Sequence, residues 1–230
     1  TGAAYLTGTL DATGQTFPIQ PGALLSGIHN RGSLIAGTVE MQSGVAFETV
    51  GTIAANQITG SGSIFTDGVA SFVVQPPPLT GAGGTLTIDP GITVSGRGTV
   101  GRAWASNGSG PVVGSDTVLN HGMIRAQSEV PTYGVAIIAG SFTNHGVLEC
   151  ASGFLAVGGT DFLMGRTTWT NEGTINLLGG ELRLGGEFTT AGIGTINRSG
   201  GALAVTGMLN NTGTTIDLGQ TLGDATFFGQ

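Results

Sequence analysis

Two histidines and a glutamate recur at one position of a repeated motif, and imidazole and carboxylate groups are common ligands of zinc. His121, His145 and Glu172 each follow an asparagine and precede a glycine. If these motifs lie in register about 5 Å apart, the three side chains form one surface column that could bind zinc or a similar metal. The next copy has Ile193 at this position and supplies no fourth ligand. We therefore expect a column of exposed polar residues beside a turn, with no metal and no cofactor.

Acidic residues that could cleave a carbohydrate are present but are not paired. Glycoside hydrolysis needs two carboxylates at a controlled separation, whereas Asp89, Asp116, Glu129 and Asp161 are scattered singly along the chain. The sequence also has no nucleophile-elbow serine motif and no phosphate loop. It therefore predicts a protein that is not an enzyme, with a carbohydrate-cleaving β-helix as the less favoured alternative.

Threonine pairs of the form Thr-x-Thr are typical of flat arrays that bind ice. They occur at Thr7 and Thr9 and again at Thr85 and Thr87. Such an array needs the pair on most coils of one face. We expect no repetition of the pair in the asparagine-led motifs, and therefore no ice binding.

The elements that must position these residues come from a motif that recurs between Val118 and Leu218. Its asparagine-led copies begin at Asn120, Asn144 and Asn171, a degenerate copy begins at Gly192, and the last begins at Asn211. The first four copies restart at intervals of 24, 27 and 21 residues. A supersecondary unit repeated at this period is the signature of a solenoid. We expect Asn120, Asn144, Asn171 and Asn211 to form a structural ladder along it.

Residues alternate between apolar and polar after each Asn-x-Gly. Alternate side chains of a strand point to opposite faces, so one set is predicted to point inward and the other outward. The inward set is Ile124, Leu148, Ile175 and Ile196, with Ala126, Cys150 and Leu177, and the outward set is Arg125, Glu149, Asn176 and Asn197. A second apolar series is predicted to form an internal column of large side chains: Val118, Phe142, Trp169 and Phe188.

Further strands bounded by glycines are predicted over 154–157, 181–184 and 202–205. Two or three short strands per coil with glycine-rich corners describe a parallel β-helix of roughly ten coils. An antiparallel sandwich is the alternative, but Asn-Gly or Asp-Gly hairpin signals occur only at Asn107 and Asp67. We expect one all-β solenoid domain over residues 1–230, clearest over 118–218. A subdivision near 76–84, beside three consecutive prolines, is the alternative.

Composition and charge exclude several classes of protein. Charged residues make up 9% of the chain, all seven cations are arginine, and the net charge is −7. Nucleic-acid binding needs clustered basic residues, so it is not expected. No apolar run is long enough for a membrane-spanning helix. The single cysteine, Cys150, is predicted to be a buried thiol.

The Asn-x-Gly-x-Ile coil, alternating with glycine-bounded strands, resembles passenger domains of bacterial autotransporters and adhesins of the filamentous haemagglutinin type. The resemblance is clear over 118–218 and weak over 30–36 and 84–101. It implies a right-handed parallel β-helix, secretion or display on a bacterial surface, and a role in adhesion or surface assembly. It supplies no catalytic residues.

Apolar residues near both ends of the chain suggest how such a rod would assemble. Leu6, Phe227 and Phe228 lie in sequence without a charged cap, and the terminal coils of a solenoid expose strand edges that must be capped or matched. We expect a homo-oligomer or polymer, a structural subunit that self-associates end to end into a fibre, sheath or surface layer. The alternative is an adhesin-type rod that binds a host glycan or polysaccharide through loops at 75–84, 105–115 and 128–134.

Overall fold

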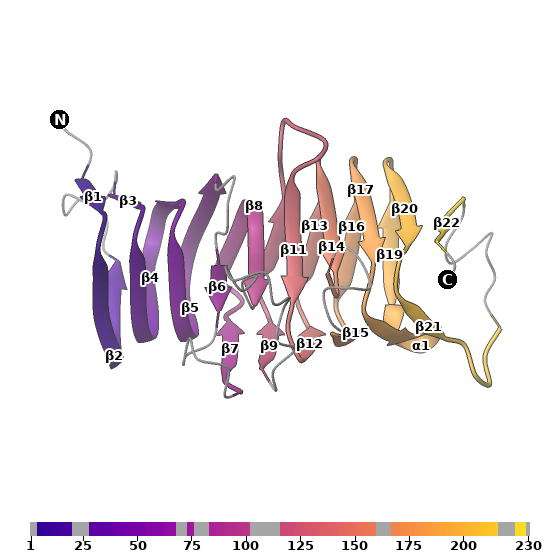
Figure 1. Cartoon of the computed structure of the whole chain (residues 1–230), viewed down its shortest axis with the longest axis horizontal. Coiled ribbons are helices and arrows are strands. Elements are labelled where there is room, and N and C mark those ends of the chain that lie inside the picture. Colours follow the sequence, from indigo (N-terminus) through magenta and orange to yellow (C-terminus); the bar gives the residue numbers. More distant parts are fainter. Residues whose placement is uncertain are drawn as a thin grey trace.

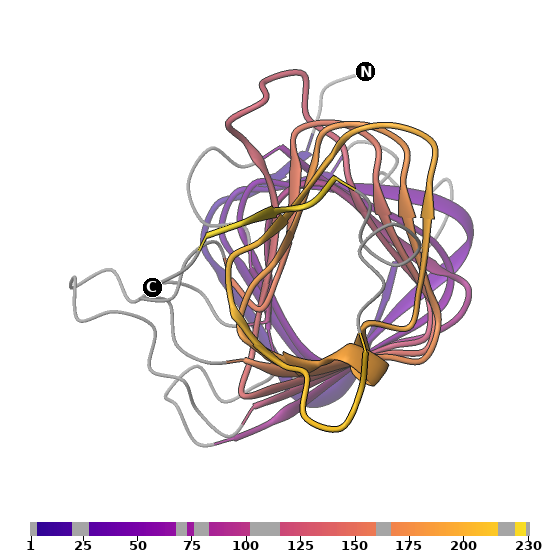
Figure 2. The ribbon, with the colours of Figure 1, turned by 90° about the vertical axis from the view of Figure 1, so that its right-hand side faces the viewer.

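The computed structural model is a right-handed parallel β-helix (Figure 1). The structure describes residues 4–19, 28–67, 73–75, 83–101, 116–159, 167–215 and 224–228. Within these ranges there are 22 strands and one short helix, α1 (Thr190–Ile193), and every strand pairing is parallel. Seen along the axis from the C-terminal end, successive coils superpose into a tube whose chain turns anticlockwise toward the viewer (Figure 2). The predicted fold class is confirmed.

Each coil contributes strands to three faces of the tube, which we name A, B and C in chain order. Face A consists of β1 (Ala4–Leu6), β3 (Ile28–Asn30), the last parts of β4 (Ser33–Thr49) and β5 (Thr52–Asp67), the first part of β8 (Ile92–Gly101), β10 (Met123–Ala126), β13 (Val147–Cys150), β16 (Thr174–Leu177) and β19 (Thr195–Arg198).

Faces B and C take the remaining strand segments. Face B consists of the first parts of β2 (Thr9–Ile19), β4 and β5, then β6 (Val73–Gln75), the end of β8, β11 (Gly134–Ile138), β14 (Phe154–Val157), β17 (Glu181–Leu184), β20 (Ala202–Val205) and β22 (Thr226–Phe227). Face C consists of the end of β2, the middles of β4 and β5, then β7 (Thr85–Ile88), β9 (Thr117–Asn120), β12 (Ser141–Asn144), β15 (Thr168–Asn171), β18 (Glu187–Thr189) and β21 (Met208–Asn210). The ten segments of face B agree with the roughly ten coils expected.

The coils stack so that equivalent residues of the repeat lie directly on one another. Ile124 pairs with Leu148, and Leu148 pairs with Ile175, and all three are fully buried. On face C, Phe142 pairs with Trp169, whose ring stacks on that of Phe188 at a centroid distance of 4.6 Å. The Trp169 indole donates a 2.7 Å hydrogen bond to the carbonyl of Gly185, which satisfies its one polar atom.

Glycines at the corners of the tube serve two different physical needs. At the corner between faces A and B, Gly153, Gly180 and Gly201 adopt φ values of 71°, 66° and 70°, a conformation that costs energy for a residue with a Cβ. At the corner between faces C and A the need is close approach. A Cβ added to Gly146 would lie 2.0 Å from the carbonyl oxygen of Gly122, and one added to Gly173 would lie 2.1 Å from that of Gly146.

The motif at Asn30-Arg31-Gly32 does not occupy the corner of the later asparagine-led motifs. It joins β3 of face A to β4 of face B, whereas Asn120 and Gly122 lie between faces C and A. Residues 30–36 thus share residue types with the later motifs but occupy a different corner of the coil. Both corners require a residue without a bulky side chain beside the neighbouring coil, so the short motif Asn-x-Gly suits either.

Strand pairing continues across the region of the suggested subdivision near residues 76–84. The predicted loop at 105–115 and most of that at 75–84 lie outside the described residues. Strands β5 and β7, before and after the suggested subdivision, pair through Ile58 and Ile88. Both residues belong to one buried hydrophobic cluster.

Replacing Gly146 by alanine should destabilise the rod because the new methyl group collides with backbone. We expect the free energy of unfolding to fall by about 1–3 kcal/mol, the usual cost of overpacking, measured by urea denaturation. Gly8→Ala is the matched control, because a Cβ there meets no atom within 4 Å. Equal stability of the two variants would contradict the close approach at this corner.

Candidate functional site

Three buried asparagines form a hydrogen-bonded ladder along the corner between faces C and A. Asn120, Asn144 and Asn171 end β9, β12 and β15, and they are 0%, 0% and 4% exposed. The Asn120 amide donates to Oδ1 of Asn144, and the Asn144 amide donates to Oδ1 of Asn171, both at 2.7 Å. The Asn144 amide also donates to the carbonyl of Gly146 at 3.2 Å. The ladder therefore satisfies backbone and side-chain groups at a turn where strand pairing is interrupted.

The ladder does not include Asn211. The Asn171 amide instead donates to the carbonyl of Ile193 at 2.9 Å. Asn211 follows β21, is exposed, and accepts hydrogen bonds from the hydroxyls of Thr190 and Thr214 at 2.5 and 2.8 Å. The residue inserted before the isoleucine of this last motif already sets it apart from the other copies.

The predicted polar column does form, but its donor atoms do not converge. The rings of His121 and His145 stack with centroids 4.7 Å apart and an interplanar angle of 9°. Nδ1 of His145 lies 3.2 Å from a carboxylate oxygen of Glu172. Nearly parallel rings direct their nitrogen lone pairs in parallel, whereas zinc needs them aimed at one point. In the described part of the chain no group of three His, Cys, Asp or Glu residues is arranged to hold a metal ion.

The acidic residues considered for carbohydrate cleavage lie at three different corners. Asp89 follows β7 at the corner between faces C and A, where both carboxylate oxygens accept from the Gln57 amide at 3.1 and 3.2 Å. Asp116, only 3% exposed, precedes β9 and accepts from the backbone of Gly84 at 3.1 Å. Glu129 lies between β10 and β11, at the corner between faces A and B. These three carboxylates cannot form a glycosidase pair, and Asp161 lies outside the described residues.

Outward side chains on face A pair between neighbouring coils. Nε of Arg125 lies 3.0 Å from a carboxylate oxygen of Glu149, and the Asn197 amide donates to Oδ1 of Asn176 at 3.1 Å. Such surface pairs, which are partly exposed, contribute little to stability individually. They do fix the register, since a shift of one residue would break both contacts.

A column of outward hydroxyl groups runs along face C, and the sequence analysis did not predict it. The expectation that the threonine pair is not repeated in the asparagine-led coils fails at one coil, where Thr168 and Thr170 flank the apolar residue two positions before Asn171. In register, the outward positions are Thr85 and Thr87, Thr117 and Leu119, Ser141 and Thr143, and Thr168 and Thr170. Two of these hydroxyls, on Thr117 and Ser141, lie 3.0 Å apart.

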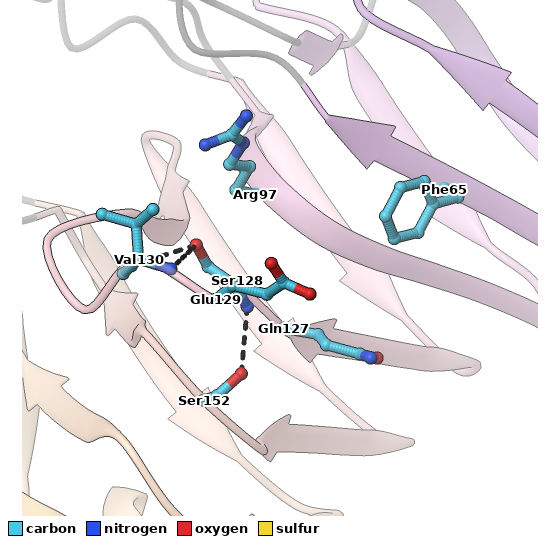
Figure 3. Close-up of a pocket in the computed structure, with 7 residues that line it drawn as sticks. All are labelled: Phe65, Arg97, Gln127, Ser128, Glu129, Val130 and Ser152. Atoms are coloured by element: carbon cyan, nitrogen blue, oxygen red, sulfur yellow. Dashed lines mark hydrogen bonds between the residues drawn. The ribbon is translucent and has the colours of Figure 1, made fainter.

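A hollow of about 470 Å³ lies at the corner between faces A and B (Figure 3). We call it the corner trough. Its lining residues come from four coils of the tube: Phe65, Arg97, Gln127, Ser128, Glu129, Val130 and Ser152. The Arg97 guanidinium lies over the ring of Tyr133 at 5.0 Å. The predicted loop at 128–134 therefore forms one wall, whereas no local sequence pattern points to the other residues.

The loop that forms this wall is held in a single conformation by hydrogen bonds. The Ser128 hydroxyl accepts from the backbone N–H of Val130 at 3.2 Å and donates to its carbonyl at 3.0 Å. The backbone N–H of Ser128 donates to the hydroxyl of Ser152 at 3.1 Å. At the other end of the loop, the N–H of Phe154 donates to the carbonyl of Tyr133 at 3.2 Å. The wall is thus attached to the coil that follows it.

Comparisons with protein-family models, with curated proteins and with solved structures found no match. Among the described residues, no helix has the length and apolar character needed to cross a membrane.

Replacing Asn144 by alanine should break the ladder on both sides. The Asn120 amide would lose its 2.7 Å acceptor and Oδ1 of Asn171 would lose its 2.7 Å donor. Since buried polar groups without partners cost about 1–3 kcal/mol each, we expect a loss of about 2–4 kcal/mol in urea denaturation. The exposed Asn211→Ala variant should change stability by less than about 0.5 kcal/mol. Similar losses of unfolding free energy in both variants would show that the ladder contributes no more to stability than an exposed asparagine.

Cys150 should be unreactive in the folded protein. Burial raises the pKa of its thiol from 9.0 to about 11, so the reactive thiolate is scarce at pH 8. We expect a thiol-specific reagent to label the native chain slowly and the urea-unfolded chain rapidly.

The unfolded thiol ionises near pH 9 and the folded thiol near pH 11, so the stability contributed by this group falls between these values. In Cys150→Ala that part of the pH dependence should vanish; an unchanged pH profile would contradict this assignment.

Proposed function

We propose that this chain is a non-enzymatic structural β-solenoid, secreted or displayed on a bacterial surface, that self-associates end to end into a fibre, sheath or surface layer. The observation that carries the proposal is the state of the apolar interior at the two ends of the rod. At several interior positions, residues that are fully buried in the middle coils have partly exposed equivalents in the first or last coil.

Paired positions in neighbouring coils make this contrast measurable. On face B, Leu10 of the first coil is 36% exposed, whereas its partner Leu34 in the next coil is 1% exposed. Among the described residues, the partly buried side chains that pack against the main core cluster lie in the end coils: Leu6, Ala12, Phe17, Ile196, Leu209 and Ala225. Covering these surfaces removes apolar area from water, which favours association.

The first and last strands of each face also have a described partner on one side only. Within the described ranges, β1 pairs with β3 alone and β2 with β4 alone, and at the other end β19 pairs with β16 alone and β21 with β18 alone. If the end of one rod docks on the start of another, the parallel faces continue across the joint. Such a contact joins two different surfaces and does not close on itself, so it generates a filament.

Two exposed phenylalanines lie beside the final strand pairing. Strand β22 pairs with β20 through Phe227 and Val205, and Phe227 and Phe228 are 48% and 61% exposed. We propose that both contribute to the joint, where Phe227 continues the face B column that begins at Leu10 of the next subunit. Leu6 contributes to the same joint at the start of face A. An adhesin-type rod remains the second candidate, and the corner trough is the observation that favours it.

Charged substitutions at the two ends should weaken assembly. We expect Leu6→Asp and Phe228→Asp each to shift the onset of filaments to at least tenfold higher protein concentration, because a carboxylate would be buried at the joint. Light scattering across a concentration series, with electron microscopy of the same samples, measures this shift.

Val130→Asp is the matched control, since Val130 is 42% exposed and lies in the middle of the rod, between β10 and β11. Far-UV circular dichroism checks that all variants are folded. Assembly of both end variants at the wild-type concentration, or failure of the wild-type chain to assemble at any concentration, would sink the proposal.

A further inference from the structure

We propose that the corner trough binds a neutral oligosaccharide, with one sugar ring packed on Phe65 and its hydroxyls bonded by Gln127 and Glu129. The inference concerns the middle of the rod and does not depend on assembly of its ends. Its first support is the size of the hollow, because about 470 Å³ lies within the usual range of ligand sites.

The trough combines apolar and hydrogen-bonding groups in the way a sugar requires. Phe65 and Val130 are 37% and 42% exposed, and they lie on either side of the polar residues (Figure 3). The Glu129 carboxylate accepts hydrogen bonds, and the Gln127 amide both donates and accepts them. A sugar ring has an apolar C–H face and a rim of hydroxyls, so it complements both kinds of wall.

The charges of the trough favour a neutral ligand. Its lining has one arginine and one glutamate, and the chain as a whole carries a net charge of −7. A nucleic acid would need clustered basic residues, and an acidic polysaccharide would be repelled by the overall charge. A neutral sugar needs no cluster of basic residues and is not repelled by the negative charge of the chain.

A peptide that adds a strand to the sheet has no edge to join here. Strand β8 pairs with β5 and β10, and β10 pairs with β8 and β13. Because both edges of these strands are occupied, recognition must come from side chains. The four coils that line the trough are spaced at about 4.8 Å, so an extended ligand along the rod would meet new side chains at each coil.

The walls are held in place before any ligand arrives. Ser128 is 8% exposed and fixes the loop through its bonds to Val130 and Ser152, and Arg97 lies over Tyr133. A rigid site loses little conformational entropy on binding, which suits a ligand that makes few contacts.

The test is isothermal titration calorimetry of the full chain with defined hexasaccharides. The neutral probes are cellohexaose, maltohexaose, mannohexaose and chitohexaose, and the acidic probe is hexagalacturonate. We expect at least one neutral probe to bind with a Kd below about 1 mM, Phe65→Ala to weaken binding at least tenfold, and Glu129→Ala at least threefold. Thr168→Ala, exposed on face C, is the control and should bind like the wild type.

Three results would overturn the inference. These are no heat with any neutral probe up to millimolar concentration, wild-type affinity in Phe65→Ala with an unchanged circular dichroism spectrum, and tighter binding of hexagalacturonate than of any neutral probe. Sedimentation of the same samples separates this site from assembly. Loss of sugar binding with unchanged association, in Phe65→Ala, is the result expected if the two are independent.

Discussion

Parallel stacking of the coils in register, at the spacing of one backbone hydrogen bond, is the constraint on which the rest of this structure depends. It places each residue within about 4.8 Å of its equivalent in the next coil. Each side chain must therefore fit against the side chain at the same position of the adjacent coil. Inside, this favours apolar columns such as Ile124, Leu148 and Ile175. At particular corner positions it leaves room only for glycine, as at Gly146.

The asparagine ladder is the polar solution to the same constraint. At the corner, the carbonyl of Gly146 accepts from the N–H of Thr174 in the next coil and also from the Asn144 amide. An asparagine amide can donate to this carbonyl and to the next asparagine while it accepts from the one before, so a single residue type repeats along the corner. Upstream the aligned residue is Ile88, and there the corner depends on backbone contacts, such as the hydrogen bond from His121 N–H to the Ile88 carbonyl.

The sequence predicts the fold well where one residue type marks one place in the coil. The strands at 154–157, 181–184 and 202–205 have the bounds expected from their flanking glycines. Prediction from sequence fails where no asparagine-led motif marks the corners of the coil. Strands β4 and β5 run for 17 and 16 residues through two corners each, and no Asn-x-Gly motif marks any of these corners.

Among the candidate sites, one contact could be predicted from the repeat and one hollow could not. The contact between His145 and Glu172 follows from repeat spacing alone, since both occupy one position of the motif. The corner trough could not be found by spacing, because Phe65, Arg97 and Ser152 occupy unrelated motif positions in coils of unequal length. Only the three-dimensional path of the chain brings them together.

The direction of the inter-coil hydrogen bonds also determines how the rod responds to force. These bonds run along the long axis, while the polypeptide winds across it (Figure 1), so a pull on the two ends loads the bonds and not the covalent chain. When a coil yields, its residues become slack: the 24 residues from Asn120 to Asn144 correspond to about 80 Å of extended chain. Under tension such a rod lengthens in steps, one coil at a time, and dissipates energy at each step.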